Sequence, residues 1–393
     1  MAQIVKKADL DKRLDTLGKL ARFDVTGVPL LFASGRRSLR FHFIYPAVGE
    51  KGGCVNLFKV LQSNLCEHNC FYCANRKARN CPRVEFTPEE LSQLFLHYWK
   101  EGWVRGLFLS SAIHPSPDQA QEKMLRTVLL LRRRYGYCGY IHCKILPGTD
   151  EAFIEKIAPL ADRLSINLEA PTQKHLSRLS PDKPPQPQLL EQLKKIAIYN
   201  SIHPLRAGVT TQLVVGASGE SDREILSLSQ DLYRRYGLRR VYYSGFIPVR
   251  DTPLEQLPPC LPLRELRLYQ ADFLLRRYGF ETEELFFEEK KNLPLDKDPK
   301  LAWALNHPDR FPVELNTASF EELIRVPGIG RISAKRIIET RKVTRFKDLD
   351  QLRKLGAVTG RAQGFVTLSG KFYPPKRSQS EKISKQLFLW EEL

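Results

Sequence analysis

The chain has 393 residues, which is enough for two or three domains with a sizeable hydrophobic core. Its formal charge of +18 indicates a polyanionic partner, and nucleic acid is favoured over a membrane surface because no amphipathic anchor is visible. No stretch approaches the ~20 apolar residues of a membrane span, and the first ten residues do not read as a secretory signal. Eight cysteines in a chain of this length do not suggest a disulfide scaffold, so a reducing, cytoplasmic setting is expected.

Residues 1–50 are interpreted as an N-terminal helix with a basic extension. Leucines recur on one side of an amphipathic helix expected over residues 6–22. Short extended segments are expected to follow up to residue 45, with a basic group at Arg36, Arg37 and Arg40. This group is interpreted as a solvated loop, and contact with a nucleic-acid backbone is the alternative.

Strands and helices alternate from residue 55 onward. A helix is expected after each of six strands, which we place at residues 55–62, 104–111, 140–146, 163–170, 209–216 and 239–248. Thr87 and Glu90 have the spacing of a capping box at the start of the first of these helices. Six such units predict an α/β fold with a parallel sheet, closed into a partial (β/α)6 barrel over residues 51–289. Barrels of this kind place their chemistry at the carboxyl ends of the strands.

Three cysteines lie directly after the first of these strands, with the spacing C-x3-C-x2-C: Cys66, Cys70 and Cys73. Iron–sulfur clusters usually take four protein ligands, so three ligands leave one iron open for a small molecule. A structural zinc site would normally require a fourth ligand. A redox pair formed by Cys70 and Cys73 would leave Cys66 without a role. The spacing therefore favours a cluster with an open iron.

This motif resembles that of the radical S-adenosylmethionine (SAM) enzymes. The resemblance implies a 4Fe-4S cluster held by Cys66, Cys70 and Cys73, and SAM bound to the open iron. It also implies that Tyr72 lies beside the adenine. Reduction of the cluster by a donor such as flavodoxin or ferredoxin would cleave SAM to a deoxyadenosyl radical.

Two other strand ends are candidate SAM contacts. Ser110 and Ser111 stand where the family carries a Gly-Gly-Glu-like segment that binds the amino group of SAM, so the serines or their backbone would make that contact. Asn167 and Glu169, two residues apart on an expected strand, would share one face and hold the ribose or carboxylate of SAM. A salt-bridged rim is the alternative for this second pair.

The last two strands end in segments that resemble the family's adenine site. Gly216 and Gly219 would allow close approach of the backbone to the adenine, although a strand-to-helix turn can require glycine by itself. Ile247 lies in a segment similar to the one that flanks the adenine in the family.

The remaining side chains near the barrel mouth carry no recognisable pattern. Lys144 would contact substrate or phosphate, or form a buried ion pair, and His142 lies two residues before it. The other cysteines follow no ligand spacing, and buried cysteines often behave as small hydrophobic residues, so a second cluster is not favoured. These are Cys54, Cys81, Cys138, Cys143 and Cys260.

A change in composition marks a second domain. Residues 290–312 are rich in Pro and Asp and are interpreted as a linker with one helical turn around Trp303. Beyond it, the run from Val326 to Gly330 resembles the helix-hairpin-helix module of DNA-binding proteins. Gly328 and Gly330 would shape a tight turn that leaves backbone N–H groups free to bind a phosphate. A second, degenerate copy is expected between Phe346 and Val358.

Charge supports a nucleic-acid role for this small all-α domain, expected over residues 313–372. Residues 313–377 carry fourteen Lys or Arg against six Asp or Glu. Arg331 and Lys335, which follow the turn, are the predicted contacts; a hairpin that binds protein is the alternative. Residues 373–393 are expected to form a basic, partly ordered tail.

The whole arrangement resembles a family described as DNA modification or repair radical SAM proteins, whose members are associated with a uracil-DNA-glycosylase-like protein. The resemblance implies an enzyme that acts on DNA, on a flipped base or a single strand. The alternatives are an enzyme that modifies RNA, such as a tRNA base, and a DNA-binding protein whose cluster is not catalytic.

Overall fold

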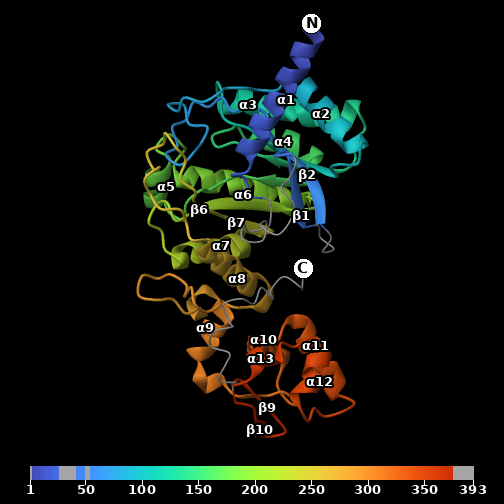
Figure 1. Ribbon diagram of the computed structural model, residues 1–393, viewed down its shortest axis with the longest axis vertical. Helices are drawn as coiled ribbons and strands as arrows, with labels where there is room; N and C mark the ends of the chain where they lie inside the picture. Colours follow the sequence, from blue (N-terminus) through green and yellow to red (C-terminus); the bar gives the residue numbers. More distant parts are fainter. Residues whose placement is uncertain (1, 26–40, 49–53, 375–393) are drawn as a thin grey trace. The chain divides into compact units, whose positions relative to one another are not determined.

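The computed structural model describes residues 2–25, 41–48 and 54–374 (Figure 1). It divides into two compact units. Unit 1 comprises Met1–Glu220 and Asp231–Glu265, and unit 2 comprises Ser221–Gln230 and Leu266–Leu393. The basic group at Arg36, Arg37 and Arg40, and nearly all of the expected tail, lie outside the described residues.

Unit 1 is built on one seven-stranded sheet in which the strands follow chain order. The strands are β1 (Ile44–Val48), β2 (Cys54–Leu61), β3 (Gly106–Ser110), β4 (Tyr140–Lys144), β5 (Arg163–Ser165), β6 (Val209–Val215) and β7 (Arg240–Gly245). Neighbouring strands from β2 to β7 are parallel, which confirms the six predicted strands. The first strand, β1, was not predicted, and it pairs antiparallel with β2.

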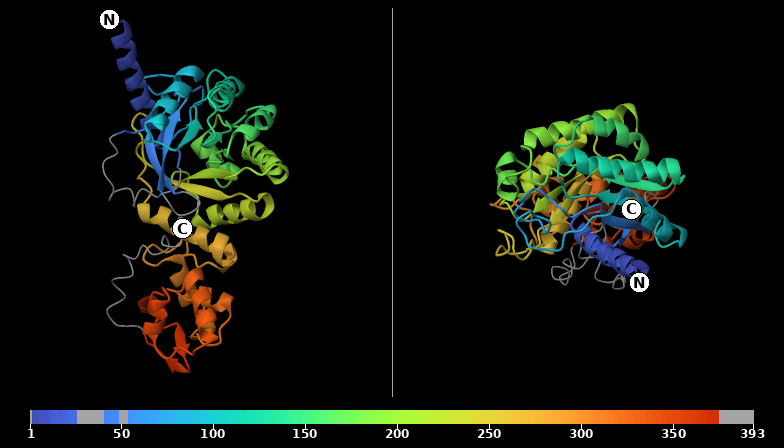
Figure 2. Two further views of the ribbon diagram at one scale, coloured as in Figure 1. Left: turned by 90° about the vertical axis from the view of Figure 1, so that its right-hand side faces the viewer. Right: turned by 90° about the horizontal axis from the view of Figure 1, so that it is seen from above.

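Helices alternate with these strands and cover the outer side of a half-barrel into which the sheet curls (Figure 1 and Figure 2). Unit 1 contains α1 (Ala2–Ala21), α2 (Pro88–Lys100), α3 (Pro117–Leu129, extended by a π-helical turn over Leu130–Arg134), α4 (Ala152–Ile157), α5 (Gln173–Leu179) and α6 (Gln186–Ile202). The helices α7 (Asp222–Tyr236) and α8 (Pro262–Tyr278) each have residues in both units. None of the described helices is long and apolar enough to cross a membrane.

The start of α2 shows how local sequence places these helices. Thr87 Oγ1 accepts a hydrogen bond from the Glu90 N–H at 3.2 Å, and the Glu90 carboxylate accepts one from the Thr87 N–H at 2.9 Å. This reciprocal pair satisfies two backbone donors that the helix itself cannot, and it confirms the predicted capping box.

The two faces of the sheet differ in chemistry. On β2, the Phe58 ring packs against Phe95 and Tyr98 of α2, with ring centroids 5.9 and 5.8 Å apart, so Phe58 belongs to the helix-covered outer face. Successive side chains of a strand alternate between faces, which puts Lys59 on the concave face. The concave face is therefore partly polar, although Lys59 is only 1 % exposed.

Unit 2 is mainly helical, with a small sheet that was not predicted. Its helices after α8 are α9 (Pro299–Leu305), α10 (Phe320–Arg325), α11 (Arg331–Arg341), α12 (Leu349–Lys354) and α13 (Thr359–Ala362). Three short strands form the sheet, in the order β10-β9-β8: β8 (Val313–Glu314), β9 (Val366–Leu368) and β10 (Lys371–Phe372).

The segment expected to be a linker is part of the core of unit 2. The predicted helical turn around Trp303 is present as α9, but Trp303 is only 1 % exposed. Its indole packs edge-on against Phe280 at 5.2 Å and beneath the guanidinium of Arg325 at 5.0 Å. Proline and aspartate in this segment cap and start α9, with Asp298 accepting from the Leu301 N–H, instead of marking an extended connection.

Candidate functional site

The loop after β2 carries the three cysteines, and backbone hydrogen bonds hold it at the carboxyl end of the sheet. The Glu67 N–H donates to the Ile113 carbonyl oxygen at 2.8 Å, and the Phe71 N–H donates to the Leu179 carbonyl oxygen at 2.7 Å. The loop is thus tied to the segment after β3 and to the end of α5. Cys70 is buried, whereas Cys66 and Cys73 are half-buried.

The three thiols lie close enough to affect one another electrostatically. Burial raises the pKa of Cys73, and the neighbouring Cys70 and Cys66 raise it further. Burial likewise raises the pKa of Cys70, while the ammonium of Lys183 and a contact with Ser180 Oγ, 3.0 Å from Cys70 Sγ, act in the opposite direction. The fold has therefore brought together three sulfur atoms in a place that disfavours bare thiolates.

This arrangement fits an iron–sulfur cluster, whose cations would neutralise three thiolates at once. Each thiolate of such a cluster binds a different iron, so the sulfur atoms need not converge on one point. Among the residues that the structure describes, no group of three His, Cys, Asp or Glu is placed to hold a single metal ion.

Arg83 organises the chain that follows the cysteines, and sequence analysis missed it. Its guanidinium donates to the carbonyl oxygens of Asn64 at 2.7 Å and Asn75 at 2.8 Å. It also donates to carbonyl oxygens of Arg76 and Arg79 at 2.5 and 3.0 Å. One side chain thus closes the loop from both ends. Arg83 lies ten residues after Cys73, and no pattern in the neighbouring sequence indicates this role.

A buried ion pair lies beside the cysteines. Lys183 Nζ is 2.6 Å from Glu169 Oε1 and 3.4 Å from the Tyr72 hydroxyl oxygen, and both members of the ion pair are nearly inaccessible. Burial raises the pKa of Tyr72, and Glu169 raises it further. The structure thus brings Tyr72 and Glu169, both expected near SAM, into one cluster with Lys183, which sequence analysis did not single out.

The second oxygen of Glu169 has a separate significance. Glu169 Oε2 is buried and has no hydrogen-bond partner in the described part of the chain. Buried polar atoms are seldom left without a partner, so this oxygen fits a donor on a bound molecule such as a ribose hydroxyl of SAM.

The strand that carries Asn167 and Glu169 is shorter than predicted. Only Arg163–Ser165 is regular strand, because the Thr211 hydroxyl accepts from the Leu168 N–H and donates to the Ile166 carbonyl oxygen, replacing ladder bonds. Glu169 has a φ of 63°, in the left-handed region. The two side chains are both buried, but strict strand alternation does not relate them.

The serines at the end of β3 already have partners. The Ser110 hydroxyl bonds the carboxylate of Asp24, where it lowers the pKa of that group. The Ser111 hydroxyl donates to the neighbouring Ala112 carbonyl oxygen at 2.8 Å. Both serines lie at the predicted carboxyl edge, but neither hydroxyl points unpaired into the site.

The turn after β6 is shaped by Glu220 as well as by its glycines. Gly216 and Gly219 have φ values of 92° and 78°, which only glycine adopts readily. The buried Glu220 carboxylate accepts from the Gly216 N–H and from the Ser218 N–H and hydroxyl. Ile247, after β7, is 42 % exposed. Sequence analysis did not single out Glu220.

In unit 2, the predicted hairpin turn joins α10 to α11. Gly328 has a φ of 83°, whereas Gly330, the N-cap of α11, has a φ of −89°, which any residue adopts. The backbone of the turn therefore requires glycine at Gly328, whereas the backbone conformation at Gly330 does not. Gly328 also faces the second copy: its carbonyl oxygen accepts from the Val358 N–H at 2.8 Å.

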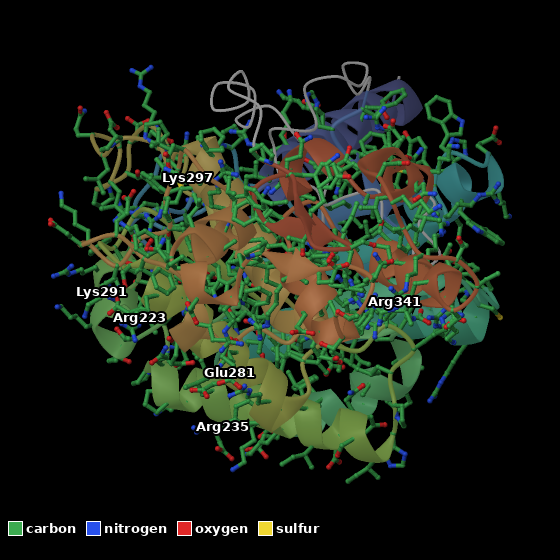
Figure 3. All side chains as sticks on the ribbon, turned by 90° about the horizontal axis from the view of Figure 1, so that it is seen from below. Arg223, Arg235, Glu281, Lys291, Lys297 and Arg341 are labelled. Atoms are coloured by element: carbon green, nitrogen blue, oxygen red, sulfur yellow. The ribbon has the colours of Figure 1, made fainter. Side chains whose placement is uncertain are left out.

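The two predicted contacts in this hairpin differ in accessibility. Lys335 is exposed on α11, whereas the Arg331 guanidinium donates to the Arg277 carbonyl oxygen and stacks on Phe320 at 5.3 Å. Arg341, labelled in Figure 3, donates to the Leu315 carbonyl oxygen at 3.0 Å and so joins the end of α11 to the segment after β8. Further exposed cations follow on this and the next hairpin: Arg345, Lys347 and Lys354.

Comparisons with known proteins agree with this description. Residues 60–232 match the model of the radical SAM superfamily, and residues 310–360 match that of the helix-hairpin-helix motif. The first match confirms the predicted fold class, the enzyme class and the two cofactors that the superfamily uses, a 4Fe-4S cluster and SAM. No curated protein matches the chain.

Solved structures to which the chain is similar include three proteins with low sequence identity to it. HydG, a maturase of the FeFe-hydrogenase, has 14 % identity over 55 % of this chain and 48 % of its own chain, with a TM-score of 0.45. The methylornithine synthase PylB has 14 % identity over 82 % of this chain and 84 % of its own, with a TM-score of 0.45. The radical SAM methyltransferase TsrM from Kitasatospora setae has 13 % identity over 60 % of this chain and 52 % of its own, with a TM-score of 0.39. The chain spans about half the length of HydG and TsrM.

Proposed function

Because residues 60–232 belong to the radical SAM superfamily, we propose that this protein cleaves SAM and uses the resulting radical to modify DNA. One observation carries the choice of substrate: the same chain contains a helix-hairpin-helix motif with a strong excess of positive charge. The bound cluster and SAM would supply a deoxyadenosyl radical that abstracts hydrogen from a base or a sugar.

The chain's own residues supply the site for this chemistry. Cys66, Cys70 and Cys73 would hold the cluster, with Arg83 keeping their loop closed. Glu169 and Tyr72 would bind SAM, since Glu169 Oε2 is a buried acceptor that lacks a donor among the described residues. Lys183 pairs with Glu169 through Oε1, which leaves Oε2 as the acceptor for the bound molecule.

The turn at Gly328 would position DNA by binding the phosphates of the DNA backbone. The N-cap of α11, Gly330, has no side-chain capping bond, so the first backbone N–H groups of this eleven-residue helix are available to a phosphate. Lys335, Lys347 and Lys354 add exposed positive charge to the same motif. Contacts of this kind position a protein on DNA without reading its sequence.

Binding and chemistry are tested separately. For binding, Lys335→Glu and Lys347→Glu should weaken the affinity for every duplex similarly and flatten its salt dependence by about one unit of slope for each lost phosphate contact. Lys291→Glu is the matched control, because Lys291 is also an exposed lysine of unit 2 but lies outside the motif (Figure 3). Unchanged affinity in both hairpin variants would contradict the nucleic-acid role.

For chemistry, the reconstituted protein should release deoxyadenosine from SAM, and nucleosides from cells with and without the gene should differ in mass spectrometry of their DNA. A difference confined to RNA would indicate a tRNA-type substrate instead. DNA binding without SAM cleavage would indicate a non-catalytic cluster. The resemblance stated above also makes a uracil-DNA-glycosylase-like protein a proposed partner, which co-purification tests.

A further inference from the structure

The concave face of the half-barrel carries cations at two neighbouring levels. Lys59 of β2, Phe108 of β3 and His142 of β4 are in register across the sheet. Lys144, two residues after His142, aligns with Ser165 of β5 and ends β4 at the edge that also carries the cysteine loop. Both lysines are buried, at 1 % and 8 % exposure.

Three residues that follow α1 lie against this face. The Gln212 side chain of β6 donates to the Phe23 carbonyl oxygen at 3.1 Å and accepts from the Val25 N–H at 2.8 Å. Between them, the Asp24 carboxylate accepts from Lys144 Nζ and bonds the Ser110 hydroxyl, while the Asp24 carbonyl oxygen accepts from Lys59 Nζ. Asp24 thus contacts strands β2, β3 and β4 at once.

Among the described residues, one carboxylate faces the two ammonium groups. This carboxylate, of Asp24, bonds Lys144 directly, whereas the contacts of Lys59 in the same part of the chain are a neutral carbonyl oxygen and the rings of Tyr45 and Phe108, at 4.1 and 5.6 Å. Burial lowers the pKa of Lys59 to about 7, and Lys144 lowers it further, against the effect of Asp24.

The other titratable groups on this face do not supply the missing anion. Burial holds the pKa of His142 well below its ordinary value, so its ring is neutral and bonds Ser165 Oγ at 2.7 Å. Arg163, next to it, has partners of its own, among them the Ala207 carbonyl oxygen and the Tyr242 hydroxyl. In the part of the chain that the structure describes, Lys59 and Lys144 therefore face one carboxylate, that of Asp24.

We propose that Lys59 and Lys144 form a binding subsite for an anionic group of the substrate, a phosphate or a carboxylate, and that the Asp24 carboxylate occupies this place until the substrate displaces it. Lysines bind phosphate as point charges, and a second anion would compensate Lys59. The choice of phosphate as the anionic group rests on the proposed function, since phosphate is the anion that a nucleic acid offers.

The experiment compares charged and uncharged probes on the purified full-length protein. Equilibrium dialysis would use the four 2′-deoxynucleoside 5′-monophosphates, the four deoxynucleosides and succinate. We expect the monophosphates to bind and the deoxynucleosides not to bind. Binding of succinate in place of the monophosphates would keep the subsite and assign it to a carboxylate. Lys59→Met and Lys144→Met should each lose the binding, because each removes one of the two cations.

Asp24→Asn separates this proposal from a purely structural ion pair. Removing the internal competitor should tighten binding of the charged probe about tenfold, since one like charge near the ligand disappears. Asp15→Asn is the control: Asp15 lies on the preceding helix and pairs with Lys19 and His42, but far more of its side chain is exposed. Unchanged or weaker binding in Asp24→Asn would overturn the proposal.

Thermal unfolding gives a readout that does not depend on a ligand. Lys59→Met should raise the unfolding midpoint by about 2–4 °C, because a buried cation without a bonded carboxylate is replaced by an apolar side chain of similar length. A large fall in the midpoint would mean that Lys59 serves stability alone, which contradicts the proposal.

Failure of this proposal and failure of the proposed function are distinguishable. DNA binding by the hairpin should be the same in all of these variants. If neither the monophosphates nor succinate bind while DNA binding persists, the subsite is wrong and the proposed function stands. If a charged probe binds as described while DNA does not bind at all, the subsite stands for an anionic small molecule and the proposed function fails.

Discussion

Lys183 Nζ lies 2.6 Å from Glu169 Oε1, in an ion pair that is almost completely removed from solvent. Glu169 holds this position with a backbone φ of 63°, outside the regular strand that precedes it. The pair stands between the cysteine loop and the end of β5, because Lys183 also contacts the Tyr72 hydroxyl and affects the pKa of Cys70. The two residues therefore couple the proposed cluster site to the proposed SAM site.

Lys183→Met should destabilise the protein strongly, by about 3–5 kcal/mol, because it leaves the Glu169 carboxylate buried without its partner. The double variant with Glu169→Gln should recover much of this loss, since the uncompensated charge disappears. Urea unfolding of the cluster-free protein measures both. A double variant no more stable than Lys183→Met would show that the ion pair is not the cause.

Cys66→Ala, Cys70→Ala and Cys73→Ala should each abolish the brown absorbance of the cluster and the cleavage of SAM, because three ligands leave no redundancy. Cys54→Ala, Cys138→Ala and Cys260→Ala should retain both, and Cys54 and Cys138 are exposed. Iron content and visible spectra after anaerobic reconstitution give the comparison. Loss of iron from a folded control variant would refute the three-ligand assignment.

Arg83→Met should loosen the loop after the cysteines, because five carbonyl oxygens lose a shared donor. We expect faster loss of iron during dialysis against a chelator and faster proteolysis within this loop. Arg126→Met is a suitable control, since Arg126 makes one exposed ion pair with Glu89. Equal rates of iron loss in the two variants would argue against an organising role for Arg83.

Glu265 should make stability fall as the pH rises. Burial raises its pKa from 4.5 to about 7, against the hydrogen bond donated by the Gly245 N–H at 3.0 Å. Between these values the folded state binds more protons than the unfolded state, so the free energy of unfolding decreases with pH. The decrease reaches at most about 3 kcal/mol above pH 7. Glu265→Gln should remove this decrease of the free energy of unfolding. Urea unfolding midpoints at pH 5 and pH 8 measure it, and a decrease that persists in Glu265→Gln would contradict the prediction.

Gly328→Ala should destabilise unit 2 and weaken DNA binding, because a Cβ atom there would lie 2.4 Å from the Val358 carbonyl oxygen and the φ of 83° would be strained. Gly330→Ala should have a much smaller effect on stability, since its φ of −89° suits any residue. Thermal unfolding and gel-shift titrations separate the two. Equal destabilisation by both substitutions would contradict the assigned geometry.

Local pattern determined the elements and the outline of the site. The alternation of apolar strands with capped helices predicted the parallel half-barrel, and the capping box at Thr87 and Glu90 formed as expected. The spacing of Cys66, Cys70 and Cys73 directly after β2 was sufficient to single out the loop that we propose as the cluster site, because it depends on chain neighbours alone. The same holds for the turn at Gly328, whose residues are contiguous.

Only the tertiary structure decided which polar groups meet. Lys144 bonds Asp24, which lies 120 positions earlier in the chain, and Ser110 uses its hydroxyl on the same carboxylate. Hydrophobic periodicity specifies which face of an element is buried, but it carries no information on the partner of a buried charge. A buried charge must find a partner wherever the fold supplies one, and for Asp24 that partner, Lys144, comes from a strand 120 positions later in the chain.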